Sequence, residues 1–168
     1  MGERIDLNAY RRAVVVAFGK AAFDMAETMA HVVAPFPLSG VVSGPGARGR
    51  TMPGFLCFSG GHPYPNADSF HAGHAVVDLL RSMTPDDLVI YLLSGGGSAL
   101  CERLIVPEVS LKEYAEFCRL LLTSGATILD VNDVRKHFSA IKGGRLAELA
   151  SPARQVTLYV SDAPAGHP

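Results

Sequence analysis

The stretch Leu88-Val-Ile-Tyr-Leu-Leu-Ser-Gly-Gly-Gly-Ser-Ala-Leu100 decides the fold of this chain. Its first half is a short apolar run with β-branched and aromatic residues, which is typical of a buried strand. Because the run does not alternate with polar residues, both of its faces should be covered, as in a parallel sheet with helices on each side. The glycines that follow allow a sharp turn and leave the backbone N–H groups uncovered.

The segment Ser94-Gly95-Gly96-Gly97-Ser98 predicts an anion-binding loop. Uncovered amides at the carboxyl end of a parallel strand are where open α/β sheets bind anions. The two serines add hydroxyl donors at either edge. A Gly/Ser turn without a ligand is the alternative, but glycines placed directly after the strand favour the anion loop.

Apolar runs and helical spacings alternate along the rest of the chain. The expected strands cover residues 13–18, 40–43, 55–58, 88–93 and 155–160, and the expected helices cover 21–30, 68–83, 110–122, 132–141 and 145–150. Strands that alternate with helices indicate an α/β domain with a mostly parallel sheet. Asp68 or Ser69 is expected to cap the second helix, and Ser110 with Glu113 forms the pattern of a capping box.

Composition narrows the possible functions. A length of 168 residues suits a single domain over residues 1–168, and 48% hydrophobic residues exclude a disordered chain. The net charge of −1 offers no basic excess for nucleic acid, and no apolar run approaches the ~20 residues of a membrane helix. Three cysteines without a C-x-x-C pattern indicate neither a disulfide framework nor a zinc ribbon, so a cytoplasmic protein is expected.

Lys20 follows the first expected strand and precedes its helix. The carboxyl ends of the strands line the ligand crevice of open α/β sheets, where a lysine supplies a point charge for phosphate or carboxylate. A solvated surface lysine is the alternative. The apolar residues on both sides of Gly19-Lys20 favour a functional charge.

A second group of cations lies in the polar stretch Asn132–Arg145, which includes Arg135 and Lys142. Arginine and lysine side chains are the usual clamps for phosphates, and Asn132 is a further candidate for binding. A solvated charged helix face is the alternative. The glycines after Lys142 favour anion binding.

Asp162 follows the last expected strand, where a carboxylate can hold Mg²⁺ or accept a hydroxyl proton, or simply cap the next turn.

His62 lies in the Gly/Pro-rich segment Gly60–Asn66, which can hold its ring in one orientation. His71 and His74 are spaced three apart, which places them on one face of the following helix. A metal site formed by the three histidines is possible in principle, but the sequence favours exposed polar histidines.

The segment Gly44-Pro-Gly-Ala-Arg-Gly49 matches the letters G-x-G-x-x-G. A dinucleotide fingerprint requires a helix directly after the glycines, and Pro45 with Pro53 argues against one. The segment is therefore not interpreted as a nucleotide site.

Taken together, these motifs resemble the type II glycerate kinases, also called the hydroxypyruvate reductase-like family. The resemblance covers nearly the whole chain and rests on Val15–Met29, Gly61–Asn66, Leu93–Leu100, Asn132–Ala147 and Val160–Pro164. It implies a Rossmann-like N-terminal domain with helices on both faces of the sheet, followed in longer family members by a smaller C-terminal domain.

The same resemblance implies ATP-dependent phosphorylation of D-glycerate, typically at the 2-hydroxyl, with Mg²⁺. It implies that Lys20 and Arg135 lie in the substrate and phosphate site, that Asp162 lies near it, and that Ser94–Ser98 forms the anion loop. The chain is then expected to be truncated, with a C-terminal domain supplied separately or a homo-oligomer.

One departure leaves other functions open. After Ser161-Asp162 the family usually reads valine, proline, glycine and acidic residues, whereas this chain reads Ala163–Pro168. A catalytically inactive α/β remnant that binds anions is therefore one alternative. An NAD(P)H-dependent hydroxypyruvate reductase is another, against which the failed G-x-G-x-x-G pattern argues.

Overall fold

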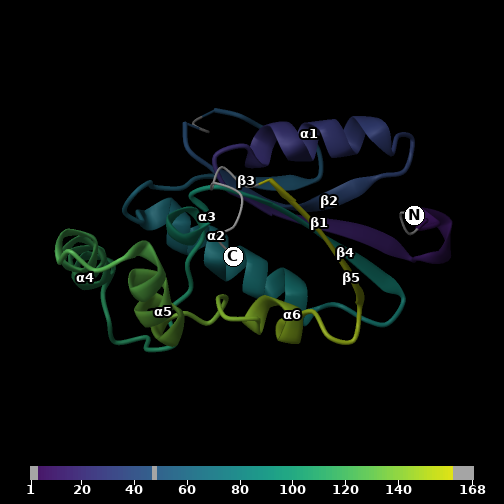
Figure 1. Cartoon of the computed structure of the whole chain (residues 1–168). Helices are drawn as coiled ribbons and strands as arrows, with labels where there is room; N and C mark the ends of the chain where they lie inside the picture. The colour runs from purple at the N-terminus through teal and green to yellow at the C-terminus, as the bar shows by residue number, and fades with distance from the viewer. Residues whose placement is uncertain (1–3, 47–48, 161–168) are drawn as a thin grey trace.

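The sequence predicts a mostly parallel sheet, and every strand pair of the observed sheet is parallel. The computed structural model describes residues 4–46 and 49–160. Its five strands lie in the order β3-β2-β1-β4-β5 (Figure 1). Their bounds are β1 (Arg12–Phe18), β2 (Leu38–Gly44), β3 (Phe55–Ser59), β4 (Asp87–Ser94) and β5 (Arg154–Val160).

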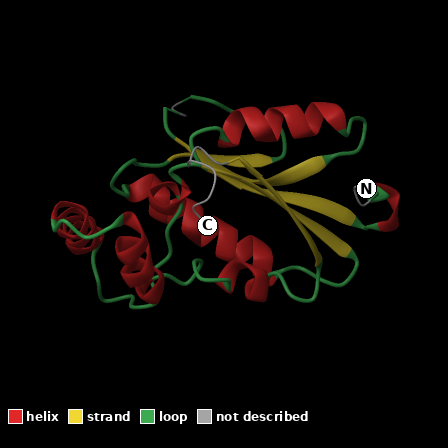
Figure 2. Cartoon of the chain, viewed as in Figure 1, coloured by secondary structure: helices red, strands yellow, loops and turns green. Residues whose placement is uncertain are grey.

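Helices cover both faces of this sheet. The helices of the described residues are η1 (Leu7–Ala9), α1 (Ala22–Val32), α2 (Ala67–Arg81), α3 (Gly97–Leu100), α4 (Leu111–Thr123), α5 (Ile128–Phe138) and α6 (Arg145–Leu149). Helix α1 lies on one face and α2 with α6 on the other, while α4 and α5 stand apart, beyond the end of the sheet where α3 lies (Figures 1 and 2). The predicted α/β fold, with helices on both faces of a parallel sheet, is confirmed.

Two helix starts differ from the prediction because other residues cap them. Asn66, rather than Asp68 or Ser69, caps α2, and its side chain accepts a 2.9 Å hydrogen bond from the Ser69 N–H. Helix α5 begins four residues earlier than expected, because Thr127 and Asp130 form a capping box. The capping box predicted for α4 is confirmed.

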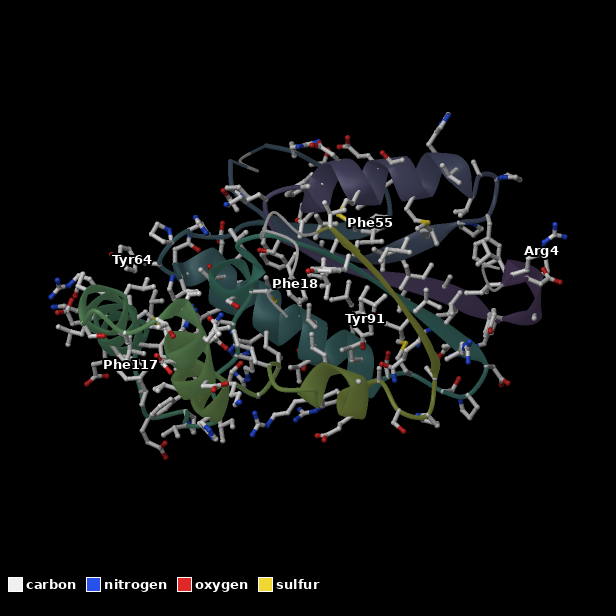
Figure 3. All side chains as sticks on the ribbon, in the orientation of Figure 1. Arg4, Phe18, Phe55, Tyr64, Tyr91 and Phe117 are labelled. Atoms are coloured by element: carbon white, nitrogen blue, oxygen red, sulfur yellow. The ribbon has the colours of Figure 1, made fainter. Side chains whose placement is uncertain are left out.

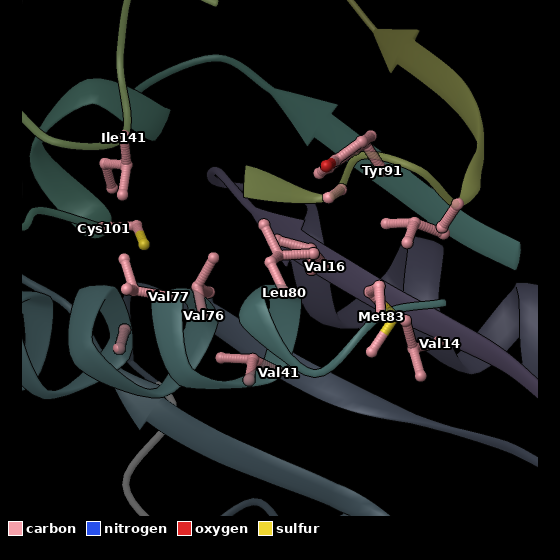
Figure 4. Packing of buried hydrophobic residues seen from close by; sticks show 14 residues of the cluster. Val14, Val16, Val41, Val76, Val77, Leu80, Met83, Tyr91, Cys101 and Ile141 are labelled. Atoms are coloured by element: carbon pink, nitrogen blue, oxygen red, sulfur yellow. The ribbon is translucent and has the colours of Figure 1, made fainter. Parts of the chain in front are cut away.

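The core is built on the two central strands, β1 and β4. Val14 and Val16 point into the layer with α2 (Figure 4), whereas Val15 and Ala17 point into the layer with α1. Tyr91 of β4 lies between the sheet and α6 (Figure 3). Non-alternating strands are thus buried on both faces.

Among the described helices, none is both long enough and apolar enough to cross a membrane.

A buried carboxylate joins the amino ends of β1 and β4. Asp87 is fully buried, and it accepts hydrogen bonds from Arg11 at 3.0 Å, from Arg12 at 3.1 Å and from the Thr84 N–H at 2.8 Å. Arg11, directly before β1, and Arg12, the first residue of β1, therefore anchor the amino end of the sheet through this carboxylate.

We expect Asp87→Asn to lower the free energy of unfolding by about 2 kcal/mol at neutral pH. Burial alone would raise the pKa of Asp87, but hydrogen bonds from Arg12, Thr84 and Arg11 outweigh it and lower this pKa to about 2. The carboxylate therefore stabilises the fold fully above about pH 4, and this contribution is lost as the pH falls toward about 2. Urea unfolding across that range measures it.

Asp86→Asn is the matched control, because Asp86 is exposed beside Asp87. Equal losses of stability in the two variants would contradict this role of Asp87.

Candidate functional site

The candidate site lies where the carboxyl ends of β1 and β4 meet. The helices that follow β1 and precede β4 lie on opposite faces of the sheet, so ligands are expected at this switch point. The Lys20 N–H donates to the Gly95 carbonyl at 2.9 Å, and the Ala21 N–H donates to Ser94 Oγ at 3.0 Å. A Cβ atom on Gly19 would lie 2.5 Å from the Ser94 carbonyl oxygen, so only glycine permits this approach.

The glycine loop, residues Ser94–Ser98, turns at Gly96, where φ is +81°. Helix α3 starts directly afterwards, and the first N–H groups of a helix have no acceptor within it. A Cβ atom on Gly96 would lie 2.7 Å from His62 Cδ2 and 3.4 Å from Lys20 Cε. The side chains of His62 and Lys20, both predicted site residues, therefore lie against Gly96 of the glycine loop.

Arg135 reaches the same loop from α5. Arg135 as a residue is only 4% exposed, and its Nη2 donates to the Ser98 carbonyl at 2.7 Å. Its Nε has no hydrogen-bond partner among the described residues. A buried donor without an acceptor is costly, and a guanidinium fork matches carboxylate and phosphate. An anionic ligand is the chemistry that suits this donor.

Lys142 is placed differently from the prediction. Its ammonium group pairs with Glu102, which is fully buried, so its charge is already balanced and we leave it out of the site. Sequence reasoning missed Glu102, although a charge directly after the apolar residues Ala99–Cys101 was a signal. Asn132 is exposed on α5, three residues before Arg135, and its role stays a prediction.

The histidines do not form a metal site. His71 lies beside an aspartate of its own helix and His74 contacts Arg103, whereas His62 lies on the glycine loop. No group of three potential metal ligands occurs in the part of the chain that the structure describes. The alternative of a three-histidine site is therefore wrong. Asp162, the predicted magnesium ligand, lies outside the described residues.

The rejected G-x-G-x-x-G segment is not followed by a helix. Strand β2 ends at Gly44, and the described residues from Gly49 to the start of β3 form turns and loop. Residues 47–48 lie outside the described part. The geometry of a dinucleotide fingerprint is not found here.

The whole chain, residues 1–168, matches the family described as "Domain of unknown function (DUF4147)". The chain belongs to this family, which is the N-terminal domain of the glycerate 2-kinases.

Named relatives agree with this assignment. The chain is 40% identical over 152 residues to the D-glycerate 2-kinase of Thermotoga maritima, covering 90% of this chain and 36% of that protein. It is 37% identical over 162 residues to the glycerate kinase of Homo sapiens, covering 88% and 31%. A protein of Agrobacterium vitis that is named as a hydroxypyruvate reductase is 43% identical over 161 residues, covering 94% of this chain and 40% of that protein. The chain thus spans well under half the length of these relatives.

Two crystal structures share the fold. A Thermotoga maritima glycerate kinase superposes with a TM-score of 0.82 at 37% identity, over 93% of this chain and 38% of that one. A Pyrococcus horikoshii protein gives a TM-score of 0.83 at 32% identity, over 95% and 36%. These similarities confirm the predicted α/β fold.

We expect Gly96→Ala to weaken inorganic phosphate binding by about tenfold or more, because the new Cβ would lie 2.7 Å from His62 Cδ2 and displace this ring. Its left-handed φ also costs about 1 kcal/mol of stability. Gly125→Ala is the control, since Gly125 has a φ of +83° with no heavy atom within 4 Å of its ideal Cβ position. An NMR titration with phosphate separates the two effects, and equal affinities in both variants would refute the role of Gly96.

Proposed function

We propose that this chain forms the anion-binding N-terminal part of an ATP-dependent D-glycerate kinase that phosphorylates the 2-hydroxyl. One observation carries the proposal: Lys20, His62 and Arg135, from distant parts of the sequence, lie against the same glycine loop. The names of the relatives support the same substrate.

Each group has a role that matches its chemistry. Phosphoryl transfer depends mainly on positioning and on stabilising the charge of the phosphates. The planar Arg135 guanidinium matches the geometry of a carboxylate or phosphate, and its Nε–H is the donor that has no partner among the described residues. Lys20 adds a point charge. The amides of the glycine loop donate to the remaining anionic oxygens. His62 lies where it can contact the substrate above Gly96.

ATP fits this site, because uncovered amides and a buried guanidinium with an unsatisfied Nε–H suit phosphate oxygens. When bound, ATP supplies the transferred phosphoryl group. Mg²⁺ is usually held by one or two carboxylates together with phosphates, and Asp162 is the residue that we propose for it.

The proposal also includes partners and a compartment. D-glycerate is the small-molecule partner, and a C-terminal domain or a second copy of the chain completes the cleft. Neither nucleic acid nor a membrane is part of the proposed function. Cys57, Cys101 and Cys118 are free cysteines, which is typical of a reducing compartment such as the cytoplasm.

We expect Lys20→Ala to reduce turnover by about a hundredfold or more, while the free energy of unfolding changes by less than about 0.5 kcal/mol. Lys20 is exposed, so its removal should leave packing intact. The measurement is coupled ADP release with D-glycerate, ATP and Mg²⁺, in the longest natural form of the protein and in this chain alone. Arg81→Ala is the control, because Arg81 ends α2, which runs back toward the amino ends of the strands.

Other outcomes decide between the alternatives. Full turnover in Lys20→Ala would remove Lys20 from the mechanism. Absence of both turnover and D-glycerate binding would favour the inactive remnant. Oxidation of NADH with hydroxypyruvate would favour the reductase.

A further inference from the structure

A buried carboxylate lies immediately beyond the glycine loop and α3. Glu102 is fully buried, and its Oε1 accepts hydrogen bonds from Ser139 Oγ at 2.5 Å and from the Arg103 N–H at 3.0 Å. Its Oε2 accepts a 2.7 Å hydrogen bond from the Tyr114 hydroxyl and pairs with the Lys142 ammonium. We call Glu102, Tyr114, Ser139 and Lys142 the Glu102 cluster.

The Glu102 cluster fixes the C-terminal end of α5. Ser139 is the C-cap residue of α5. Beside it, the Ala140 N–H donates to the Arg103 carbonyl at 2.6 Å and the Ile105 N–H donates to the Phe138 carbonyl at 2.9 Å. Helices α4 and α5 stand apart from the sheet (Figure 1), and these hydrogen bonds attach the C-terminal end of α5 to the segment that follows α3.

Arg135 and Ser139 are four residues apart, which places them one turn apart on the same side of the chain. Arg135 contacts Ser98 inside α3, and Ser139 contacts Glu102 just after α3. The last turn of α5 and its C-cap residue are therefore both attached to the short segment between Ser98 and Glu102. A shift of Ser139 relative to Glu102 would move Arg135 relative to the glycine loop.

Burying a charged group is costly unless its hydrogen bonds are fully satisfied, and apolar residues would pack the helices at lower cost. Burial and the adjacent Glu102 carboxylate raise the pKa of Tyr114, so its hydroxyl remains a donor. We infer that Glu102 is a positioning residue of the anion site, and that it fixes the Arg135 guanidinium against the glycine loop through α5. Only the ligand-binding test of this inference rests on the proposed function.

The first test observes Arg135 directly, in the whole chain and without a ligand. Its buried Nε–H gives an NMR signal, assigned by its loss in Arg135→Lys, and a buried N–H exchanges with solvent only through local opening. Glu102→Gln should speed this exchange by about tenfold or more. Glu113→Gln is the control, because it disturbs the α4 capping box without touching Glu102.

Unchanged exchange in folded Glu102→Gln, or an equal change in Glu113→Gln, would overturn the inference. Should Glu102→Gln fail to fold, two further variants keep the pair between Glu102 and Lys142. Tyr114→Phe removes the hydrogen bond from Tyr114 to Glu102, and Ser139→Ala removes the hydrogen bonds of the Ser139 hydroxyl with Glu102, with the Ile141 N–H and with Lys142. Each of these variants is then expected to speed exchange of the Arg135 Nε–H. Unchanged exchange in one of them, or in both, would overturn the inference.

The second test is a double-mutant cycle that uses inorganic phosphate as the probe. Glu102→Gln should weaken phosphate binding about tenfold, and the variant that combines it with Arg135→Gln should bind no more weakly than Arg135→Gln alone. Losses that add would indicate a purely structural role for Glu102 and overturn the inference. If the natural chain fails to bind D-glycerate but Arg135 exchange responds to Glu102→Gln, the proposed function fails and the positioning role stands.

Discussion

The close approach of two loops at the carboxyl ends of β1 and β4 determines the rest of the site. Gly19 lies so near the Ser94 carbonyl that no side chain fits between them, and the Lys20 amide bonds to Gly95 across the gap. This contact exists because β1 and β4 are adjacent in the sheet while the chain leaves them toward opposite faces. The strand order thus creates the place for a ligand.

The charged groups at the two ends of the sheet differ in how fully they are paired. At the amino end, Asp87 is saturated by arginines and a backbone amide, so its charge is used within the fold. At the carboxyl end, Arg135 keeps a buried Nε–H without a partner among the described residues. A buried donor without an acceptor is costly, and an anionic ligand is the kind of group that would satisfy it.

Local sequence signals were enough for the strands but not for every cap or ion pair. Continuous apolar runs such as Ala13–Phe18 leave little choice of structure, and they were placed to within about two residues. Asn66 was missed as a cap because Asp68 and Ser69 are equally good candidates by residue type. The side chains that pair with Glu102 lie 12 to 40 residues away in the chain, so a local pattern can signal a buried charge there but not its partners.

Arg135 and Lys142 show most clearly where sequence reasoning ends. Both belong to one polar stretch followed by glycines, and both were predicted to bind phosphate on the same grounds. A single carboxylate decides between them: Glu102 neutralises Lys142 and leaves Arg135 to face the glycine loop. Burial and the nearby Arg135 lower the pKa of Lys142, while the Glu102 carboxylate opposes this shift. One of the two cations of this sequence motif therefore forms an internal ion pair and the other lies at the candidate site, according to where one distant carboxylate lies.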